Sequence, residues 1–223
     1  EISAWLEFRR VLFRSQLHPN GLPEAFIIGE KFIKKDNVAL ILGDNFFYGQ
    51  SLGIKLREST KLKSGAKVFL HKVSKPEQYG VAKINKNKKI IKIVEKPKKF
   101  VSDYAITGLY FFDNKVIKLA KTLKPSKRGE TEIIDLLNKY KNEKKLKADF
   151  IGRGGAWLDT GSIKDFYNTS TFVSTIENRQ GMKIACIEEI AFYNKWIKRK
   201  EIQNSIKFYG NCDYSNYLKK IIN

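Results

Sequence analysis

Short apolar runs between polar segments predict a series of β-strands along most of the chain. The run at residues 38–43 (VALILG) is continuously apolar, which is typical of a strand buried on both faces of a parallel sheet. Residues 79–84 and 89–94 flank the polar stretch NKNK and predict a hairpin. Gly108 interrupts another apolar run, and a glycine inside a strand marks a bulge or a close approach of a ligand to the backbone. Further runs predict strands at residues 67–73, 104–112, 147–151 and 156–158.

Apolar residues at spacings of three and four predict helices between the strands, at residues 22–33 and 132–140. From residue 162 onward the pattern is helical in three stretches, and SIKD opens the first of them with a Ser-x-x-acid helix start signal. The pattern therefore predicts an α/β fold, in which a sheet is followed by C-terminal helices. We expect an α/β core over residues 16–161 and a helical part over residues 162–223.

The formal net charge of +20 raises the possibility of a nucleic-acid-binding protein. The lysines, however, are scattered among Asn and Ile, as in KINKNKKIIKIVEKPKK. No recognition helix, zinc-finger spacing or Gly-aromatic RNA-binding signature accompanies them. We interpret the charge as a solvated Lys-rich surface and expect no nucleic acid as partner, with nucleic-acid binding kept as the alternative from another function class.

The two cysteines, Cys186 and Cys212, lie in unrelated contexts and form no CxxC pair. This usage argues against a zinc site or a disulfide framework and fits a reducing, cytoplasmic setting. The longest apolar runs are far shorter than the roughly 20 residues that a membrane span requires, so no membrane association is expected.

Two acidic residues follow apolar runs. Asp44 comes directly after VALILG, and Asp159 ends the run in GGAWLDTG. In open α/β sheets, ligands bind beyond the carboxyl ends of the strands. Either residue alone would be read as a turn residue or helix cap. As a pair, two carboxylates suit a hard cation that is carried with substrate phosphates, which Mg²⁺ prefers to an all-protein cage.

A second group of residues suits a sugar phosphate. Tyr79 and Gly80 open a strand, and the glycine exposes backbone amide and carbonyl groups to a small ligand. Glu95 can accept hydrogen bonds from two sugar hydroxyls, and Lys96 can pair with a phosphate. Arg128 precedes a helix, where its guanidinium and the helix N-terminus could share an anion.

The loop QLHPNGL, residues 16–22, leads into a predicted helix. Gly21 could let backbone amides approach a flat base, and the Gln16 side chain supplies a donor and an acceptor to the edge of that base. Pro-Asn-Gly is also an ordinary turn, so both interpretations stay open at this point. No Ser/His/Asp or Cys/His arrangement is readable, which argues against covalent nucleophilic catalysis.

Eight stretches in unbroken chain order resemble the glucose-1-phosphate thymidylyltransferases, and the last of them resembles the short type: QLHPNGLPEAF, LILGDNFFYG, EQYGVAKI, VEKP, YAITGLYFFD, KPSKRGETEI, GRGGAWLDTG and ENRQGMKIACIEEIAFYNKWI. The resemblance implies a Rossmann-like nucleotide-diphospho-sugar transferase fold with a mixed, mostly parallel central sheet. It also implies Mg²⁺-dependent transfer from dTTP to α-D-glucose 1-phosphate, giving dTDP-glucose for dTDP-rhamnose and related polysaccharide and lipopolysaccharide precursors. A homotetramer with feedback by a dTDP-sugar near the C-terminal helices is implied as well. A UTP-using sugar-1-phosphate nucleotidyltransferase is the alternative enzyme.

The resemblance also implies a role for each candidate residue. Asp44 and Asp159 match the pair that binds Mg²⁺. Gln16 and Gly21 match residues that read the thymine base, with Leu22 beside them. The remaining matches are the glucose-binding positions and the basic residues that hold the sugar's phosphate, namely Tyr79, Gly80, Glu95 and Ile106 for glucose, and Lys96 and Arg128 for the phosphate. With Asp44 and Asp159, the two basic residues form the expected catalytic set.

The family's nucleotide signature, GGxGTRLxPxT followed by a Lys-Gln pair, has no counterpart in the sequence. Its backbone amides and Arg would clamp the triphosphate. Residues 1–15 match no part of the family, and EFRRVLFRS can be back-translated into the end of a common sequencing-library adapter. We therefore expect residues 1–15 to be non-native and residues 16–223 to be a truncated, poorly active domain that lacks the first strands of its sheet. A genuine divergent N-terminus is the alternative.

Overall fold

The computed structural model describes residues 14–223. Nearly all of the segment that we predict to be non-native, residues 1–15, lies outside the described residues. The chain divides into two compact units, Glu1–Asp159 and Thr160–Asn223, which are described separately here.

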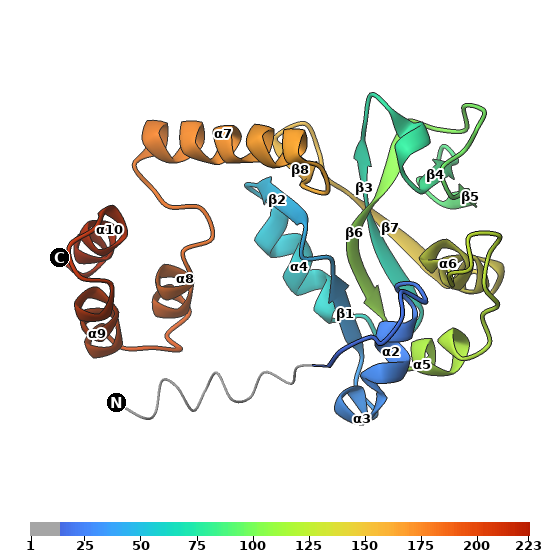
Figure 1. Ribbon diagram of the computed structural model, residues 1–223, viewed down its shortest axis with the longest axis horizontal. Coiled ribbons are helices and arrows are strands. Elements are labelled where there is room, and N and C mark those ends of the chain that lie inside the picture. Colours follow the sequence, from blue (N-terminus) through green and yellow to red (C-terminus); the bar gives the residue numbers. More distant parts are fainter. Residues whose placement is uncertain (1–13) are drawn as a thin grey trace. The chain divides into compact units, whose positions relative to one another are not determined.

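The first unit is built on a six-stranded mixed sheet with the order β5-β4-β6-β3-β7, in which β1 also pairs with β6 (Figure 1). Strand β6 runs antiparallel to β1, β3 and β4, and β3 runs parallel to β7. It follows that β1, β3, β4 and β7 share one direction, so the predicted mixed α/β sheet is confirmed. The bounds are β1 Val38–Ile41, β3 Ala66–Lys72, β4 Val81–Ile84, β5 Ile90–Val94, β6 Tyr104–Phe112 and β7 Leu146–Phe150.

Alternation along β6 gives the sheet two apolar faces. Ile106, Tyr110 and Phe112 belong to the main core, and helices α2, α3, α5 and α6 contribute to it. Leu109 and Phe111 point to the other face, where they form a smaller cluster with side chains of α4 and β2. The helix bounds are α2 Glu24–Ile28, α3 Glu30–Ile33, α4 Leu52–Thr60, α5 Lys115–Ala120 and α6 Ile133–Asn142, with a short 3₁₀ helix η1 at Pro76–Gln78.

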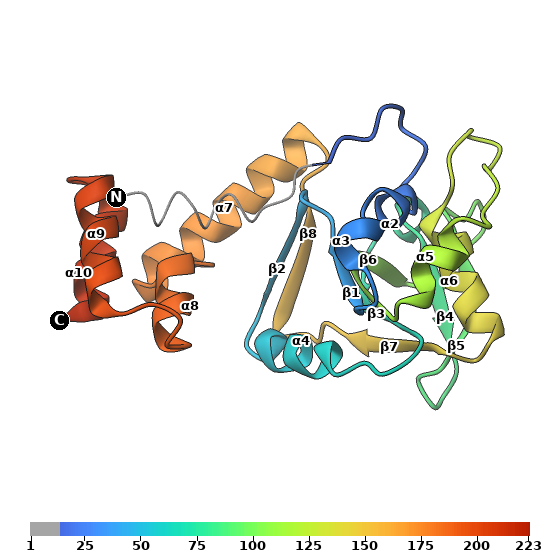
Figure 2. The same cartoon turned by 90° about the horizontal axis from the view of Figure 1, so that it is seen from below.

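A separate two-stranded ribbon pairs β2 (Asn45–Gly49) with β8 (Gly155–Asp159), and both views show the strands side by side (Figures 1 and 2). The pairing is antiparallel, with Asn45 opposite Asp159 at one end and Gly49 opposite Gly155 at the other. The ribbon joins two segments that lie more than a hundred positions apart in the chain.

Two local predictions are wrong. Strand β1 is not buried on both faces of a parallel sheet, because it pairs antiparallel with β6 and Ile41 is 59% exposed. A continuously apolar run shows that a strand forms but not how many neighbours it has. The helix predicted at residues 22–33 is two short helices, α2 and α3, which are separated by a turn residue, Gly29.

The second unit contains only helices: α7 Ile163–Gln180, α8 Ile187–Tyr193, α9 Arg199–Tyr209 and α10 Asp213–Ile222. The predicted start signal is confirmed, because the Ser162 hydroxyl accepts a hydrogen bond from the Asp165 N–H at 3.1 Å. Gly181 ends α7 in the left-handed conformation, with φ of 67°. Ile202 and Leu218 are fully buried where α8, α9 and α10 pack. Among the described residues, no helix is both long and apolar enough to cross a membrane.

Candidate functional site

Asp44 and Asp159 come together where the β2–β8 ribbon meets the end of β1. After β1 the chain turns sharply, with the Asn45 N–H donating to the Leu42 carbonyl at 3.1 Å, and then enters β2. Asp44 lies in this turn, and Asp159 is the cross-strand partner of the next residue, Asn45. The backbone therefore brings the two acidic residues close in the fold, with Asp159 opposite Asn45 and Asp44 directly before it.

Asn45 was assigned only to a turn, yet its side chain has the most extensive hydrogen bonding around this pair. Its Oδ1 accepts from the Gly108 backbone N–H at 2.9 Å and from the Trp157 Nε1–H at 2.6 Å. Its Nδ2 donates to Asp44 Oδ1 at 2.8 Å. Gly108 does mark a close approach, as the sequence indicated, but it is the amide of Asn45 that approaches. The polar amide directly after Asp44 was the available signal.

The donor chemistry fits a Mg²⁺ ion that arrives with nucleotide phosphates. Asp44 and Asp159 supply hard oxygen ligands, and Mg²⁺ in such sites is typically bound by one or two carboxylates plus phosphates and water. Within residues 14–223 no group of three or more His, Cys, Asp or Glu side chains is placed to hold a metal ion by itself. Two carboxylates with bound water can hold the ion in part, and substrate phosphates would add further oxygen ligands.

The predicted sugar-binding residues also converge. The Ile106 N–H donates to the Gly80 carbonyl at 2.8 Å, and the Lys96 N–H donates to the Tyr79 carbonyl at 3.1 Å. Gly80 lies so close to Glu95 that an added Cβ would be 3.0 Å from Glu95 Oε2. The hairpin β4–β5 and strand β6 hold this group in place. The Ile106 side chain, at 6% exposure, faces the core.

Trp157 links the predicted sugar-binding residues with the turn that holds Asp44. Its ring packs edge-to-face against Tyr79, with ring centroids 5.1 Å apart, and against His71 at 6.4 Å. Its indole N–H donates to Asn45, and the residue is only 7% exposed. The Trp157 indole therefore lies between the predicted sugar-binding residues and the turn after β1. The sequence analysis had not singled out this residue.

Basic and acidic side chains meet at Glu95. Its pKa is raised mainly by burial and then by the negative charge of Glu132, whereas Lys96 and Arg128 act in the opposite sense. Arg128 Nη1 lies 3.7 Å from Glu132 Oε1. Arg128 lies in the loop that precedes α6, which begins at Ile133, one residue after the predicted start. Its recorded ion-pair partner is Glu132.

The raised pKa of Glu95 predicts a specific pH dependence of stability. The folded chain holds this proton more tightly than the unfolded chain, so Glu95 lowers the free energy of unfolding as pH rises from about 4.5 through its raised pKa. Glu95→Gln should remove this loss. The melting temperature of the variant minus that of the parent should grow across this window and then level off. Glu77→Gln, at an exposed glutamate, is the matched control. A pH-independent difference for Glu95→Gln would contradict the prediction.

The loop with Gln16, Gly21 and Leu22 is tied to the loop that carries Arg128. The Thr131 N–H and its hydroxyl each donate to the Asn20 carbonyl at 2.8 Å. Gly21 has φ of 106°, and an added Cβ would lie 2.0 Å from the Thr131 carbonyl oxygen, so close backbone contact already requires glycine here. Gln16 Nε2 donates to the Gly21 carbonyl at 3.2 Å.

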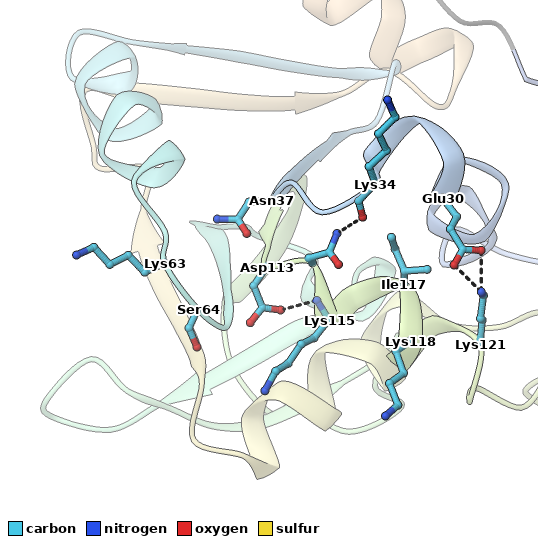
Figure 3. Close-up of a pocket in the computed structure, with 11 residues that line it drawn as sticks. Glu30, Lys34, Asn37, Lys63, Ser64, Asp113, Lys115, Ile117, Lys118 and Lys121 are labelled. Atoms are coloured by element: carbon cyan, nitrogen blue, oxygen red, sulfur yellow. Dashed lines mark hydrogen bonds and ion pairs between the residues drawn. The ribbon is translucent and has the colours of Figure 1, made fainter.

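A cavity of about 590 Å³ lies at the other end of β6 and includes none of the predicted site residues (Figure 3). Asp113 forms part of its wall and is already satisfied by the Gly65 N–H and the Tyr140 hydroxyl, each at 2.7 Å. Figure 3 shows Lys34, Lys63 and Lys115 pointing in different directions. These ammonium groups do not converge on one point, so they do not form an anion-binding site. They are solvated lysines at the rim of the cavity.

Comparison with known proteins gives concordant results. The nucleotidyl transferase family matches residues 4–176. The match includes residues 4–15, so the expectation that residues 1–15 match no part of the family is wrong for these positions. A glucose-1-phosphate thymidylyltransferase of Neisseria meningitidis serogroup A / serotype 4A is 43% identical over 212 residues, which cover 95% of this chain and 74% of the relative. The Neisseria gonorrhoeae protein of the same name is 45% identical over 213 residues, covering 96% and 74%.

Solved structures agree in fold. A crystal structure of a glucose-1-phosphate thymidylyltransferase from Bacillus anthracis in complex with sucrose superposes with a TM-score of 0.65 at 39% identity, over 72% of this chain and 64% of that one. A UDP-glucose pyrophosphorylase with UDP-glucose also gives 0.65, over 74% of this chain and 66% of that one. At 24% identity, this second likeness is one of fold alone.

Proposed function

Because the chain belongs to the glucose-1-phosphate thymidylyltransferase family of nucleotidyl transferases, we propose that its site transfers a nucleotidyl group from dTTP to α-D-glucose 1-phosphate. The products are dTDP-glucose and pyrophosphate. The observation that supports the proposal is the β2–β8 pairing, which places Asp159 opposite Asn45, the residue after Asp44. Trp157 links Asn45 to Tyr79, one of the predicted sugar-binding residues.

The reaction is an in-line displacement at phosphorus. An oxygen of the glucose 1-phosphate attacks the α-phosphorus of dTTP, and pyrophosphate leaves on the opposite side. Lys96 and Arg128 hold the attacking phosphate and offset the repulsion between the two anions. Tyr79, Gly80 and Glu95 bind the glucose hydroxyls. No covalent intermediate with the protein is required.

Asp44 and Asp159 would hold the Mg²⁺ ion, which when bound with the nucleotide supplies positive charge to the phosphates as negative charge develops. In this scheme the two carboxylates would have to keep an orientation in which both can bind the same ion. Gln16, Gly21 and Leu22 bind the thymine base in this scheme, and their link to the loop of Arg128 supports their placement beside the phosphates.

The direct test is a substrate matrix of dTTP or UTP with glucose 1-phosphate, scored by release of pyrophosphate. Preference for dTTP supports the proposal, whereas preference for UTP favours the alternative enzyme. We expect the 223-residue chain to be poorly active, because its sequence contains no GGxGTRLxPxT loop that would clamp the triphosphate. The matrix therefore includes a loop-bearing chimera, in which residues 1–15 are replaced by a relative's N-terminal segment that carries the loop.

The chimera should exceed the printed sequence in turnover by about 10²-fold or more, since a group that stabilises transition-state charge is typically worth that much. The control is the same chimera with the loop's glycines replaced by bulkier residues, which should return activity to that of the printed sequence. Equal turnover by the printed sequence and the chimera would contradict the prediction.

We further propose a cytoplasmic homotetramer that supplies dTDP-glucose for deoxysugars such as rhamnose and is inhibited by a dTDP-sugar near the C-terminal helices. Large exposed apolar side chains in the second unit support a covered surface there, among them Ile187, Tyr193 and Trp196 at 66–74% exposure. Light scattering after size-exclusion chromatography measures the assembly state, and inhibition by dTDP-rhamnose measures the feedback.

A further inference from the structure

We propose that Asn45 is a positioning residue, whose side-chain amide holds the Asp44 carboxylate in the orientation that the metal ion requires. The inference rests on the function proposed above, in which Asp44 is a metal ligand. Asn45 is not one of the residues expected to contact either substrate. Its role follows from three hydrogen bonds that together connect β6, β8 and the turn after β1.

The orientation of the amide is fixed by its partners. Oδ1 accepts two N–H donors, from Gly108 and from Trp157, neither of which could donate to an amide nitrogen. The Nδ2 group must therefore face Asp44, to which it donates at 2.8 Å. The hydrogen bond from Nδ2 restricts the terminal torsion of the Asp44 carboxylate, which lies on an exposed turn.

The two anchors of the amide are themselves rigid. The Gly108 N–H belongs to β6, which is paired on both of its edges. Trp157 is 7% exposed and packed against Tyr79 and His71. The backbone at Gly108 leaves room only for the amide, because an added Cβ would lie 2.5 Å from Asn45 Oδ1. The Asn45 side chain therefore links strand β6 of the central sheet to the Asp44 carboxylate.

The proposed role differs from that of an ordinary buried hydrogen bond. Partners that orient a metal ligand typically change metal affinity by about 10–100-fold when they are removed. A purely structural amide would change stability and leave the intrinsic affinity of the folded site unaltered. Metal affinity, measured separately from stability, distinguishes the two roles.

The experiment measures binding of Mn²⁺ alone to the 223-residue chain, followed by the electron paramagnetic resonance signal of the free ion. Asn45→Ala should weaken Mn²⁺ binding by about 10-fold. In an Asp44→Asn background the same change should cause no further loss, because its effect passes through the Asp44 carboxylate. A purely structural role would lower the melting temperature in both backgrounds and leave the Mn²⁺ affinity of the folded chain unchanged in each.

A second variant leaves Asn45 in place. Gly108→Ala inserts a methyl group into the space of the amide and should also weaken Mn²⁺ binding by about 10-fold. The matched control is Thr107→Val on the neighbouring residue of β6. It removes the fully buried hydrogen bond from Thr107 Oγ1 to the Phe69 carbonyl, 3.1 Å long, without touching the amide. Its melting temperature should fall while Mn²⁺ affinity stays within twofold of the parent.

The outcomes separate the inference from the proposed function. If Asp44→Asn does not weaken Mn²⁺ binding, the metal site of the proposed function fails, and the inference fails with it. If Asp44→Asn weakens binding but Asn45→Ala and Gly108→Ala do not, Asn45 has no positioning role and the metal site stands. An equal loss of affinity in Thr107→Val would assign all the effects to stability and overturn the inference.

Discussion

Asp159→Asn should lower the turnover of dTTP and glucose 1-phosphate in the loop-bearing chimera by about 10²–10³-fold, the usual effect of removing one group that stabilises transition-state charge. The substitution keeps the shape of the side chain and removes one of the two negative charges at the end of the β2–β8 ladder. The remaining carboxylate, Asp44, would then hold the metal ion alone. The Mg²⁺ concentration that gives half-maximal rate should rise together with the fall in maximal rate.

The control for this prediction is Asp103→Asn. Asp103 forms an ion pair with Lys72 at 2.9 Å, and both side chains are substantially exposed. The same chemical change at this position should leave turnover and Mg²⁺ dependence within about twofold of the parent, because exposed pairs contribute little. Turnover retained by Asp159→Asn at low Mg²⁺ would contradict a role for this carboxylate in metal binding.

The sequence predicted the elements that depend on local pattern. Strand β6 was expected at residues 104–112 and is found at Tyr104–Phe112, because both of its faces are buried and its apolar run has no interruption except Gly108. The hairpin β4–β5 was readable from the turn residues between its strands. Asp44 and Asp159 were both expected at strand ends, but Asp44 follows β1 of the central sheet and Asp159 ends β8 of the separate ribbon. The rule for strand ends of one sheet therefore did not anticipate the pairing that brings their backbones together.

Elements whose stability depends on distant partners were not predicted. Strand β2, NFFYG, was not among the predicted strands, since only its pairing with β8 makes it a strand. Helix α4 buries no apolar side chain fully and has a weak apolar stripe, so its periodicity gave no signal. In helix α9 the only buried residue is Ile202, in a segment rich in charge and amides.

The site shows the same division. Residue types indicated which groups could bind a metal ion, a sugar or a phosphate, whereas the residues that orient them could not be recognised. Asn45 and Trp157 lie 112 positions apart and meet only because the ribbon pairs β2 with β8. The contact between Arg128 and Glu132 could have been anticipated from their spacing of four, but the loop between them is not helical.

Phe112→Ala should reduce the free energy of unfolding by about 3–5 kcal/mol, the range for truncating a fully buried aromatic side chain. The ring is completely inaccessible to solvent and lies where β6 meets two helices. It packs edge-to-face on Phe26 of α2 at 5.2 Å and against Tyr140 of α6 at 5.6 Å. It also stacks on Tyr110, with ring centroids 6.2 Å apart. Truncation therefore removes three aromatic contacts in addition to leaving a cavity. Urea denaturation of the 223-residue chain measures the effect.

Phe100→Ala is the matched control, because the Phe100 side chain is 79% exposed and its truncation should change the free energy of unfolding by less than about 0.5 kcal/mol. Phe112 lies at the end of β6 away from Gly108 and the amide of Asn45, so the two effects should separate. Below the unfolding transition, Phe112→Ala should bind Mn²⁺ as the parent does. A loss of less than about 1 kcal/mol would mean that the helices α2 and α6 close over the missing ring, and that the core is less tightly constrained than its burial indicates.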